Sequence, residues 1–395
     1  MTTTAAPTYG ADIYEDQVLL EPYEHYRALR ELGPAVWLEK HGAFAVARYA
    51  EARAVLMDSD TFRSANGIAL NEPANQAILG CTLASDGDLH AQLRKVVAHR
   101  LTPRALRPMR ELVTERADEL VAGLVQRGSF DAVSDLARAL PLSIVPDFIG
   151  WPQEGREHLL EWAGANFDSF GPMNARAERA MPKCGEMAAY GAEIVRTGNV
   201  LPGSLGAGVL EARDQGEVTT EQCMMLMLDY LAPSLDTTIS AVGSAVWLFA
   251  QHPDQWDLVR SDPGLIPNAV NEVVRFESPI RAFGRLAESD TEIGGVPIPA
   301  GSRVLVIYAS ANRDERKFER PDEFDVTRKD AVHQLGFGIG EHGCAGQGLA
   351  RMETESLLAA LARSVTRFHV GTPERALNNL IRAFGALPVT VETGA

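Results

Sequence analysis

A single cysteine in a glycine-rich stretch is the residue of this chain best placed for chemistry. In FGIGEHGCAGQGLA, Cys344 is surrounded by closely spaced glycines and precedes a run with helical character. The start of a helix favours a thiolate, which is a good metal ligand. Glycines let the backbone reach positive φ and approach a flat ligand closely. The pattern predicts that Cys344 binds a metal, and a single thiolate suits iron in a porphyrin. The simpler alternative is a turn around an inert, buried cysteine.

The spacing around this cysteine favours the metal ligand. Phe337, Gly340, Cys344 and Gly346 match the pattern F-x-x-G-x-x-x-C-x-G. This pattern resembles the haem-binding signature of the haem-thiolate monooxygenases of the cytochrome P-450 type. The resemblance covers essentially the whole chain, with the motifs in the family's order. It implies a mainly α fold with small β-sheets, a helix-rich triangular prism in which haem b lies between a long central helix and the helix of the cysteine loop. Cys344 is then the axial ligand of the haem iron.

The resemblance also implies which side chains hold the haem. His90 and Arg94 match an H-x-x-x-R pair that contacts the propionates, and guanidinium and imidazole donors suit such anions. The residues expected at the haem are Cys344, Phe337, Gly338, His90, Arg94, Arg285 and His342. The basic run RKVVAHRLTPRALRPMR is either a solvated helix face or the docking patch for an acidic ferredoxin. That ferredoxin, with its NAD(P)H-dependent reductase, is the expected source of electrons.

Three further charged residues resemble a structural motif of the family. Glu272 and Arg275 are three apart in an expected short helix, so their side chains can meet on one face. On their own they would form an ordinary surface ion pair of little energetic value. With Arg328 as third partner, the resemblance implies a partly buried network that braces the cysteine loop. Its role is structural and not catalytic.

An acid followed by an alcohol forms the candidate catalytic pair. Asp236 and Thr237 are poor helix formers that fall inside an expected helix over 219–252. A threonine there can simply bond back to the preceding turn. The resemblance implies instead that the pair delivers protons to dioxygen, which is reduced at the haem with two electrons. The segment 233–235 departs from the family pattern, because Pro233 is expected to kink the helix.

Several stretches resemble bacterial para-methoxybenzoate O-demethylases and predict the substrate pocket. The residues expected to line a narrow pocket for an aromatic ring are Phe167, Phe170, Asp229, Pro233, Ile280, Phe283 and Phe384. Each phenylalanine is equally well explained by core packing. Where an arginine for the benzoate carboxylate is expected, this chain has Asn66. Arg63 and Arg281 are the other candidate anchors, and Asp229 would repel a carboxylate. A neutral or phenolic methoxyarene therefore competes with a benzoate.

The expected reaction is hydroxylation or O-demethylation of a small aromatic compound, with the methyl group leaving as formaldehyde. Two alternatives remain, which are tailoring of a larger natural product and a haem-binding sensor or carrier without turnover. The pair Asp236-Thr237 argues against a carrier, which needs no proton delivery, and against a peroxide-driven relative. The size of the pocket discriminates between a small and a large substrate.

The elements that position these residues are mostly helices. The spacing of apolar residues along the chain predicts longer helices over 22–31, 103–126, 152–170, 219–252 and 345–368. A shorter helix is expected between Pro267 and Pro279, a hairpin around His41-Gly42, and β-structure after residue 380.

The composition is that of one large domain over 1–395. The 395 residues are 46% hydrophobic, which is ample for a large core, and no linker or repeat marks a boundary. The net charge of −16 argues against nucleic acid or an acidic membrane as partner. We find neither a signal peptide nor a membrane-spanning run, and the four cysteines are far apart. A reducing, cytoplasmic location is therefore expected.

Overall fold

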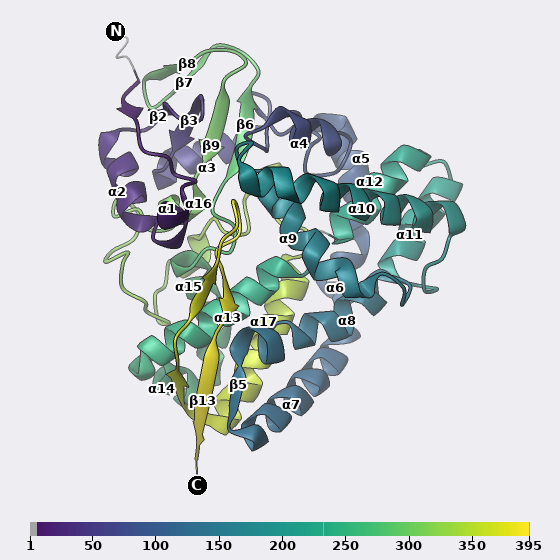
Figure 1. Cartoon of the computed structure of the whole chain (residues 1–395), viewed down its shortest axis with the longest axis vertical. Coiled ribbons are helices and arrows are strands. Elements are labelled where there is room, and N and C mark those ends of the chain that lie inside the picture. The colour runs from purple at the N-terminus through teal and green to yellow at the C-terminus, as the bar shows by residue number, and fades with distance from the viewer. Residues whose placement is uncertain (1–5, 232, 395) are drawn as a thin grey trace.

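The computed structural model describes residues 6–231 and 233–394. Figure 1 shows that helices fill most of the molecule and that the largest sheet lies at one end, close to the N-terminus. This confirms the expected mainly α fold with small β-sheets. In the described part of the chain, no helix is long and apolar enough to cross a membrane.

The α-helices carry most of the chain. Their bounds are α1 Asp16–Leu20, α2 Tyr23–Leu32, α3 Tyr49–Met57, α4 Glu72–Ala77, α5 Gly87–Ala98, α6 Pro103–Leu106, α7 Met109–Arg127, α8 Ala139–Ile149, α9 Leu159–Ser169, α10 Ala175–Thr197, α11 Leu205–Asp214, α12 Thr220–Leu231, α13 Asp236–Gln251, α14 Pro253–Ser261, α15 Ile266–Phe276, α16 Tyr308–Ala311 and α17 Gln347–Ser364. The helices expected over 22–31 and between Pro267 and Pro279 correspond to α2 and α15.

The largest sheet has six strands in the order β1-β2-β3-β9-β6-β4. Their bounds are β1 Thr8–Tyr9, β2 Val36–Leu38, β3 Ala43–Val46, β4 Phe62–Arg63, β6 Phe283–Ala287 and β9 Arg303–Val306. The predicted hairpin is present, since β2 and β3 pair antiparallel across a turn in which Gly42 has a φ of +59°. Phe283 and Arg285 are two apart on β6, so both side chains lie on the same face of the strand.

Three smaller sheets complete the β-structure. They contain β10 Val365–Val370, β13 Pro388–Thr393 and β5 Ser129–Asp131, then β11 Glu374–Ala376 with β12 Ala383–Ala386, then β7 Thr291–Ile293 with β8 Val296–Ile298. The expectation of a helix up to residue 368 is wrong at its end. α17 stops at Ser364, because the next residues pair as β10 with the C-terminal strand β13.

Two other expected helices differ from the structure, and a proline explains the first difference. The segment 103–126 is divided into α6 and α7, and Pro108 lies at the start of α7. A proline has no N–H to donate within a helix, which favours a break or a helix start there. The helix expected over 152–170 begins later, as α9 at Leu159.

The central helix is also divided, and this correction bears directly on the site. α12 ends at Leu231 and α13 begins at Asp236, while Pro233 to Leu235 form a turn and bend. Residue 232, which the predicted helix included, lies outside the described residues. Asp236 and Thr237 are therefore in the first turn of a helix and not in its middle. An interior proline also clashes with the carbonyl four residues earlier, which explains why one continuous helix does not form.

The main core lies among the helices. α13 is buried over most of its length and packs against α15 and α17. Trp256 of α14 is fully buried, and its indole N–H donates to the carbonyl of Val365 at 3.1 Å. This packing holds the loop before α17 and the beginning of α13 at one common cavity.

Candidate active site

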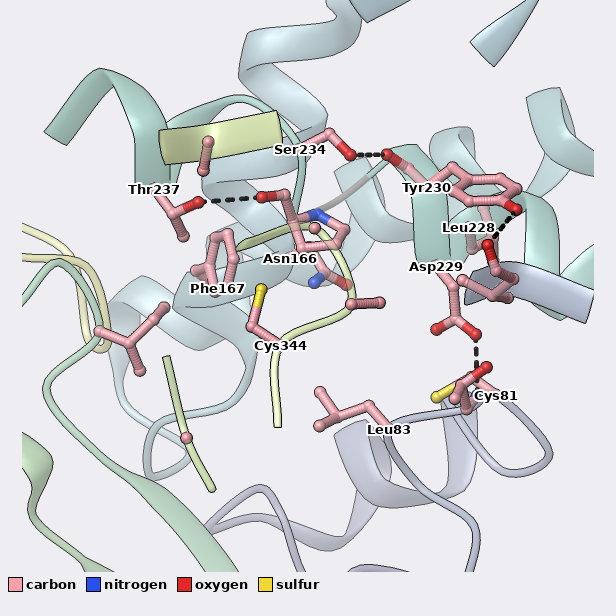
Figure 2. A pocket seen from close by; sticks show the side chains of 18 of the residues that line it. Cys81, Leu83, Asn166, Phe167, Leu228, Asp229, Tyr230, Ser234, Thr237 and Cys344 are labelled. Carbon is pink, nitrogen blue, oxygen red and sulfur yellow. Dashed lines mark hydrogen bonds between the residues drawn. The ribbon is translucent and has the colours of Figure 1, made fainter. Parts of the chain in front are cut away.

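A cavity of about 500 Å³ lies between the cysteine loop, α5, α9, the α12–α13 turn and β6. Figure 2 shows Cys344, Phe167, Thr237 and Asp229 around this space. The predicted residues that line it are Cys344, Phe337, Gly338, His90, Arg94, Arg285, His342, Thr237, Phe167, Phe170, Asp229, Pro233, Ile280 and Phe283. The fold thus brings together residues that are up to 280 positions apart in the sequence, as Ala74 and Thr354 illustrate.

The cysteine loop is shaped by its glycines. Gly338 and Gly340 have φ of +64° and +70°, and the N–H of Cys344 donates to the carbonyl of Phe337 at 2.8 Å. α17 begins three residues after the cysteine. Burial raises the pKa of the Cys344 thiol, whereas the N–H of Gly346 and the charge of Arg94 act in the opposite direction. A thiolate in this buried position is therefore favoured once a cation binds its sulfur.

Four basic side chains lie along one edge of the cavity. His90 Nδ1 is 2.9 Å from Glu341 Oε1, while the buried Nε2 of His90 has no partner among the described residues. The Arg94 guanidinium donates to the carbonyl of Gly343, and that of Arg285 donates to the carbonyl of Gly284 at 2.7 Å. Within residues 6–231 and 233–394, neither arginine lies within ion-pair distance of a carboxylate. Their charges are available to an anionic ligand.

His342 has a partner that the sequence did not suggest. Its Nε2 lies 3.3 Å from Asp86 Oδ1, and its ring lies 4.4 Å from that of His90. Burial disfavours ionisation of Asp86, but hydrogen bonds from His342 and from the N–H groups of Ala65 and Ser64 outweigh it and keep the pKa of this carboxyl well below its usual range. Asp86 therefore orients His342 at the cavity edge.

The charged network behind the cysteine loop is present. Arg275 makes two hydrogen bonds to Glu272, at 2.7 and 2.8 Å, and both side chains are fully buried. Arg328 Nε donates to the same carboxylate at 3.1 Å. The geometry is that of a buried network and not of a surface ion pair. Val274 of the same helix α15 packs so closely on Gly336 that a Cβ there would lie 2.5 Å from it, which links the network to the cysteine loop.

The acid and the alcohol of the candidate catalytic pair point in different directions. The Thr237 hydroxyl lines the cavity and donates to the carbonyl of Pro233 at 3.0 Å (Figure 2). Asp236 does not line the cavity, and its Oδ2 lies 3.3 Å from the position of a Cβ on Gly164 of α9. Burial raises the pKa of Asp236 to about 7. This carboxyl can therefore gain or lose a proton near neutral pH.

One predicted pocket residue lies elsewhere. Phe384 is on β12 behind α13, where its ring is 5.7 Å from that of Trp247 and 3.8 Å from the guanidinium carbon of Arg375. It is a core residue, because β12 turns this side chain toward α13 and away from the cavity. At this position the alternative given above, a phenylalanine that packs in the core, describes the side chain.

Neither of the two candidate carboxylate anchors, Arg63 and Arg281, lines the cavity, and Asn66 does not line it either. Arg63 Nε pairs with Asp86 Oδ2 at 3.2 Å, and Asn66 lies in a turn with a φ of +59°. Arg281 is buried, and burial lowers its pKa to about 10. The cations that do reach the cavity are Arg94 and Arg285, at the edge already described.

Comparisons with known proteins agree with this geometry. The family model Cytochrome P-450 matches residues 264–388. Cytochrome P-450 CYP199A2 of Rhodopseudomonas palustris is 40% identical over 97% of this chain and 94% of that protein. The chain belongs to the cytochrome P-450 family.

Two solved structures show how closely the fold is shared. P450BioI in complex with hexadec-9Z-enoic acid ligated acyl carrier protein superposes with a TM-score of 0.87 at 27% identity, covering 95% of this chain and 99% of that one. Cytochrome P-450 CREJ in complex with (4-ethylphenyl) dihydrogen phosphate gives a TM-score of 0.85 at 27% identity, covering 95% and 98%. The protein is thus a cytochrome P-450 monooxygenase, and its family uses a haem-thiolate cofactor, O2 and redox partners.

The residues of this P-450 fit a haem. The cavity offers a cysteine sulfur next to left-handed glycines, two arginines without a carboxylate partner, and the unpartnered Nε2 of His90. Apolar side chains that include Leu349 and Ala350 line the same space. A flat apolar ring system with an acidic edge has the shape and charge that this donor set accommodates.

Sequence reasoning missed several cavity residues of the P-450. Cys81 and Thr82 line the cavity beside Asp229, and Asn166 lines it from α9. Glu353 of α17 is fully buried with both carboxyl oxygens unpartnered in the described part of the chain, and burial raises its pKa to about 8. A carboxylate inside the apolar periodicity of α17 was the available signal for Glu353. Nothing in the local sequence indicates that the Cys81 loop meets α12.

Proposed function

We propose that this P-450 hydroxylates or O-demethylates a small aromatic compound. The observation that carries the proposal is the apolar and aromatic lining of the cavity, which has a volume of about 500 Å³ and also contains Cys344. Ligand pockets are lined mainly by hydrophobic and aromatic side chains with a few polar groups. A lining of this kind suits an aromatic ring with small substituents. Phe167, Phe170, Ile280 and Phe283 supply an apolar wall for that ring.

We propose haem b as the cofactor, with Cys344 as its axial ligand. Arg94, Arg285 and His90 would neutralise and orient the propionates at the basic edge. Glu272, Arg275 and Arg328 brace the loop that carries the cysteine. When bound, the haem supplies activation of dioxygen for insertion of one oxygen atom into a C–H bond.

The proposed role of Thr237 and Asp236 is proton delivery. Thr237 presents its hydroxyl oxygen to the cavity while its proton is engaged by the carbonyl of Pro233. Asp236 lies one residue away, beside α9, where it feels the charges of Arg138 and Asp168. Its pKa of about 7 suits a group that passes protons at neutral pH.

The solved relatives show that the family fold alone does not determine the substrate. One holds a fatty acid on an acyl carrier protein and another holds a 4-ethylphenyl phosphate. The resemblance of this chain to para-methoxybenzoate O-demethylases supports an aryl methyl ether. The cavity walls described above support a single small ring.

Electrons are proposed to come from a ferredoxin with an NAD(P)H-dependent reductase. The basic run around α6 exposes Arg104, Arg107 and Arg110 on a protein of net charge −16. A local positive patch of this kind suits an acidic redox protein.

Formaldehyde release tests the proposed reaction. With ferredoxin, reductase and NAD(P)H, the protein is expected to release formaldehyde from small methoxyarenes such as guaiacol or 4-methoxytoluene. Phe167→Trp, which fills the cavity, is expected to weaken binding of these compounds at least tenfold while the reduced carbon monoxide spectrum stays unchanged. Failure of every small arene to bind or to react, under conditions where the haem is loaded, contradicts the proposal.

A further inference from the structure

A carboxylate stands in the wall of the substrate cavity. Asp229 lies in the last turn of α12, eight residues before Thr237, and lines the cavity. Its Oδ2 accepts the N–H of Thr82 at 2.8 Å, from the loop between α4 and α5. Figure 2 shows this bond next to Cys81, with the other carboxylate oxygen turned toward the open space. The hydroxyl of Thr82 and the thiol of Cys81 lie close enough to this carboxylate to lower its pKa, but burial is the larger effect and raises it to about 6.

The charge of Asp229 is not neutralised by a nearby cation. No arginine or lysine of the described residues lies within ion-pair distance of it, and Arg94, which acts on it from farther away, faces the haem edge. A buried carboxylate without a paired cation is costly, so it favours ligands that bring a further donor to it. The same charge repels a ligand carboxylate.

Apolar side chains line the cavity around Asp229. Figure 2 shows Leu83 from the loop and Leu228 from α12 near Asp229, and Phe167 lies across the space. Asn166 contributes a neutral amide. An aromatic ring packed against the phenylalanines can therefore satisfy Asp229 with one donor group at its edge.

We propose that Asp229 is the specificity-determining residue of the substrate pocket, and that it selects an aromatic substrate bearing a hydrogen-bond donor, a phenolic hydroxyl or a protonated amine, over an aromatic carboxylate. This inference rests on the proposed function, because it assumes a small aromatic substrate. The donor group binds Oδ1 of Asp229, while Oδ2 stays on the N–H of Thr82 and holds the loop over the pocket. The polar end of the pocket thereby selects against a benzoate.

A matched ligand series tests this assignment. 4-Methoxyphenol, 4-methoxybenzylamine, 4-methoxytoluene and 4-methoxybenzoate share the methoxy group and differ in the para substituent. Binding to the haem-loaded protein is measured as Kd by equilibrium dialysis and by the optical spin-state shift. The wild type is expected to bind the phenol and the amine at least tenfold more tightly than the toluene, and the benzoate most weakly.

The substitution Asp229→Asn replaces the hydrogen-bond acceptor that faces the cavity with a hydrogen-bond donor. The amide oxygen of the variant can still accept the N–H of Thr82, which turns the amide NH2 toward the cavity. The preference for phenol and amine over toluene is expected to fall to about threefold or less, and binding of the benzoate is expected to strengthen at least tenfold. Glu221→Gln makes the same chemical change at an exposed position of α12 and is expected to leave every Kd unchanged.

The outcomes separate the inference from the proposed function. Equal Kd values of the wild type for phenol, toluene and benzoate contradict the role of Asp229 alone. An Asp229→Asn variant that folds, loads haem and keeps the wild-type order of affinities also contradicts it. Failure of the wild type to bind any of the four arenes contradicts the proposed small aromatic substrate, and the inference with it.

Discussion

At the scale of single residues, burial raises the pKa values of three titratable groups of the site. Burial raises the pKa of the Cys344 thiol, of Asp236 to about 7 and of Asp229 to about 6. The charged forms of these groups are thus disfavoured until a ligand or a partner compensates them. For the thiol a bound cation would be such a partner, and for Asp229 the proposed partner is a donor on the substrate.

The pKa of Asp236 predicts a pH dependence of turnover. Because this pKa is raised to about 7, the carboxyl is protonated below that pH and loses its proton above it. If Asp236 supplies protons, product formation per haem is expected to fall as the pH rises through about 7. Asp236→Asn is expected to remove this decline and to lower turnover by about 10²-fold, the lower end of general acid–base contributions.

The measurement is product formation and hydrogen peroxide release across pH 6 to 9, with substrate Kd as control. The Kd is expected to stay unchanged in Asp236→Asn, because this side chain does not line the cavity. A variant that keeps the wild-type pH profile would show that another group supplies the protons.

At the scale of elements, a proline interrupts one expected helix, and a carboxyl group without a partner among the described residues lies in the buried face of another. The proline at position 233 separates α12 from α13, so that Thr237 lies in a first turn with its hydroxyl on the carbonyl of Pro233. α17 carries Glu353 in its buried face, with neither oxygen bonded to a described residue. Both features lie at the cavity, where local rules of stability are commonly relaxed for function.

The buried acid of α17 predicts a dependence of stability on pH. Its pKa is about 8 in the folded protein, against 4.5 as the ordinary value. Between these values the unfolded chain has lost the proton while the folded protein keeps it, so the free energy of unfolding falls as pH rises through this window. One unit of pKa difference is worth ~1.4 kcal/mol.

Glu353→Gln is expected to abolish that fall, because an amide does not titrate. The stability of the variant relative to the wild type is therefore expected to increase by a few kcal/mol between pH 5 and pH 8.5. Denaturant unfolding at both pH values measures the difference. Glu221→Gln, at an exposed position, serves as control and is expected to show no such change. A constant difference between variant and wild type would mean that Glu353 is ionised in the fold.

At the scale of the whole molecule, charge is unevenly distributed. The chain carries a net charge of −16, yet the segment from Arg94 to Arg110 is basic and its arginines at 104, 107 and 110 are exposed. This segment includes α6, which packs against α17, the helix that follows the cysteine loop. Electrons delivered here would have a short path to the haem.

Charge reversal tests docking of the ferredoxin at this surface. Arg104→Glu combined with Arg107→Glu is expected to raise the ferredoxin KM at least tenfold at low ionic strength, and the difference is expected to shrink at high salt. Substrate Kd is expected to remain as in the wild type. Arg196→Glu, on the exposed end of α10, is the control. An unchanged KM in the double variant would place the docking surface elsewhere.

The sequence by itself determined the family, and it predicted the proposed haem ligand and most of the residues that line the cavity. Phe337, Gly340 and Cys344 were recognisable because their spacing is local, and it places the cysteine in a glycine-rich loop just before a helix. The contact between Glu272 and Arg275 was likewise predictable from the sequence, because residues three apart on a helix lie on the same face. The same reasoning failed for Phe384, because strand pairing decided which face of β12 it occupies.

Only the tertiary structure decided the polarity of the substrate end of the site. Asp229 and Thr82 are 147 positions apart, and their hydrogen bond depends on how the loop before α5 crosses α12. The pKa shifts of Asp236 and Glu353 also depend on burial, which is a property of the assembled helices and not of any segment. Local patterns report spacing along one element, whereas burial and long-range contacts arise when several elements pack together.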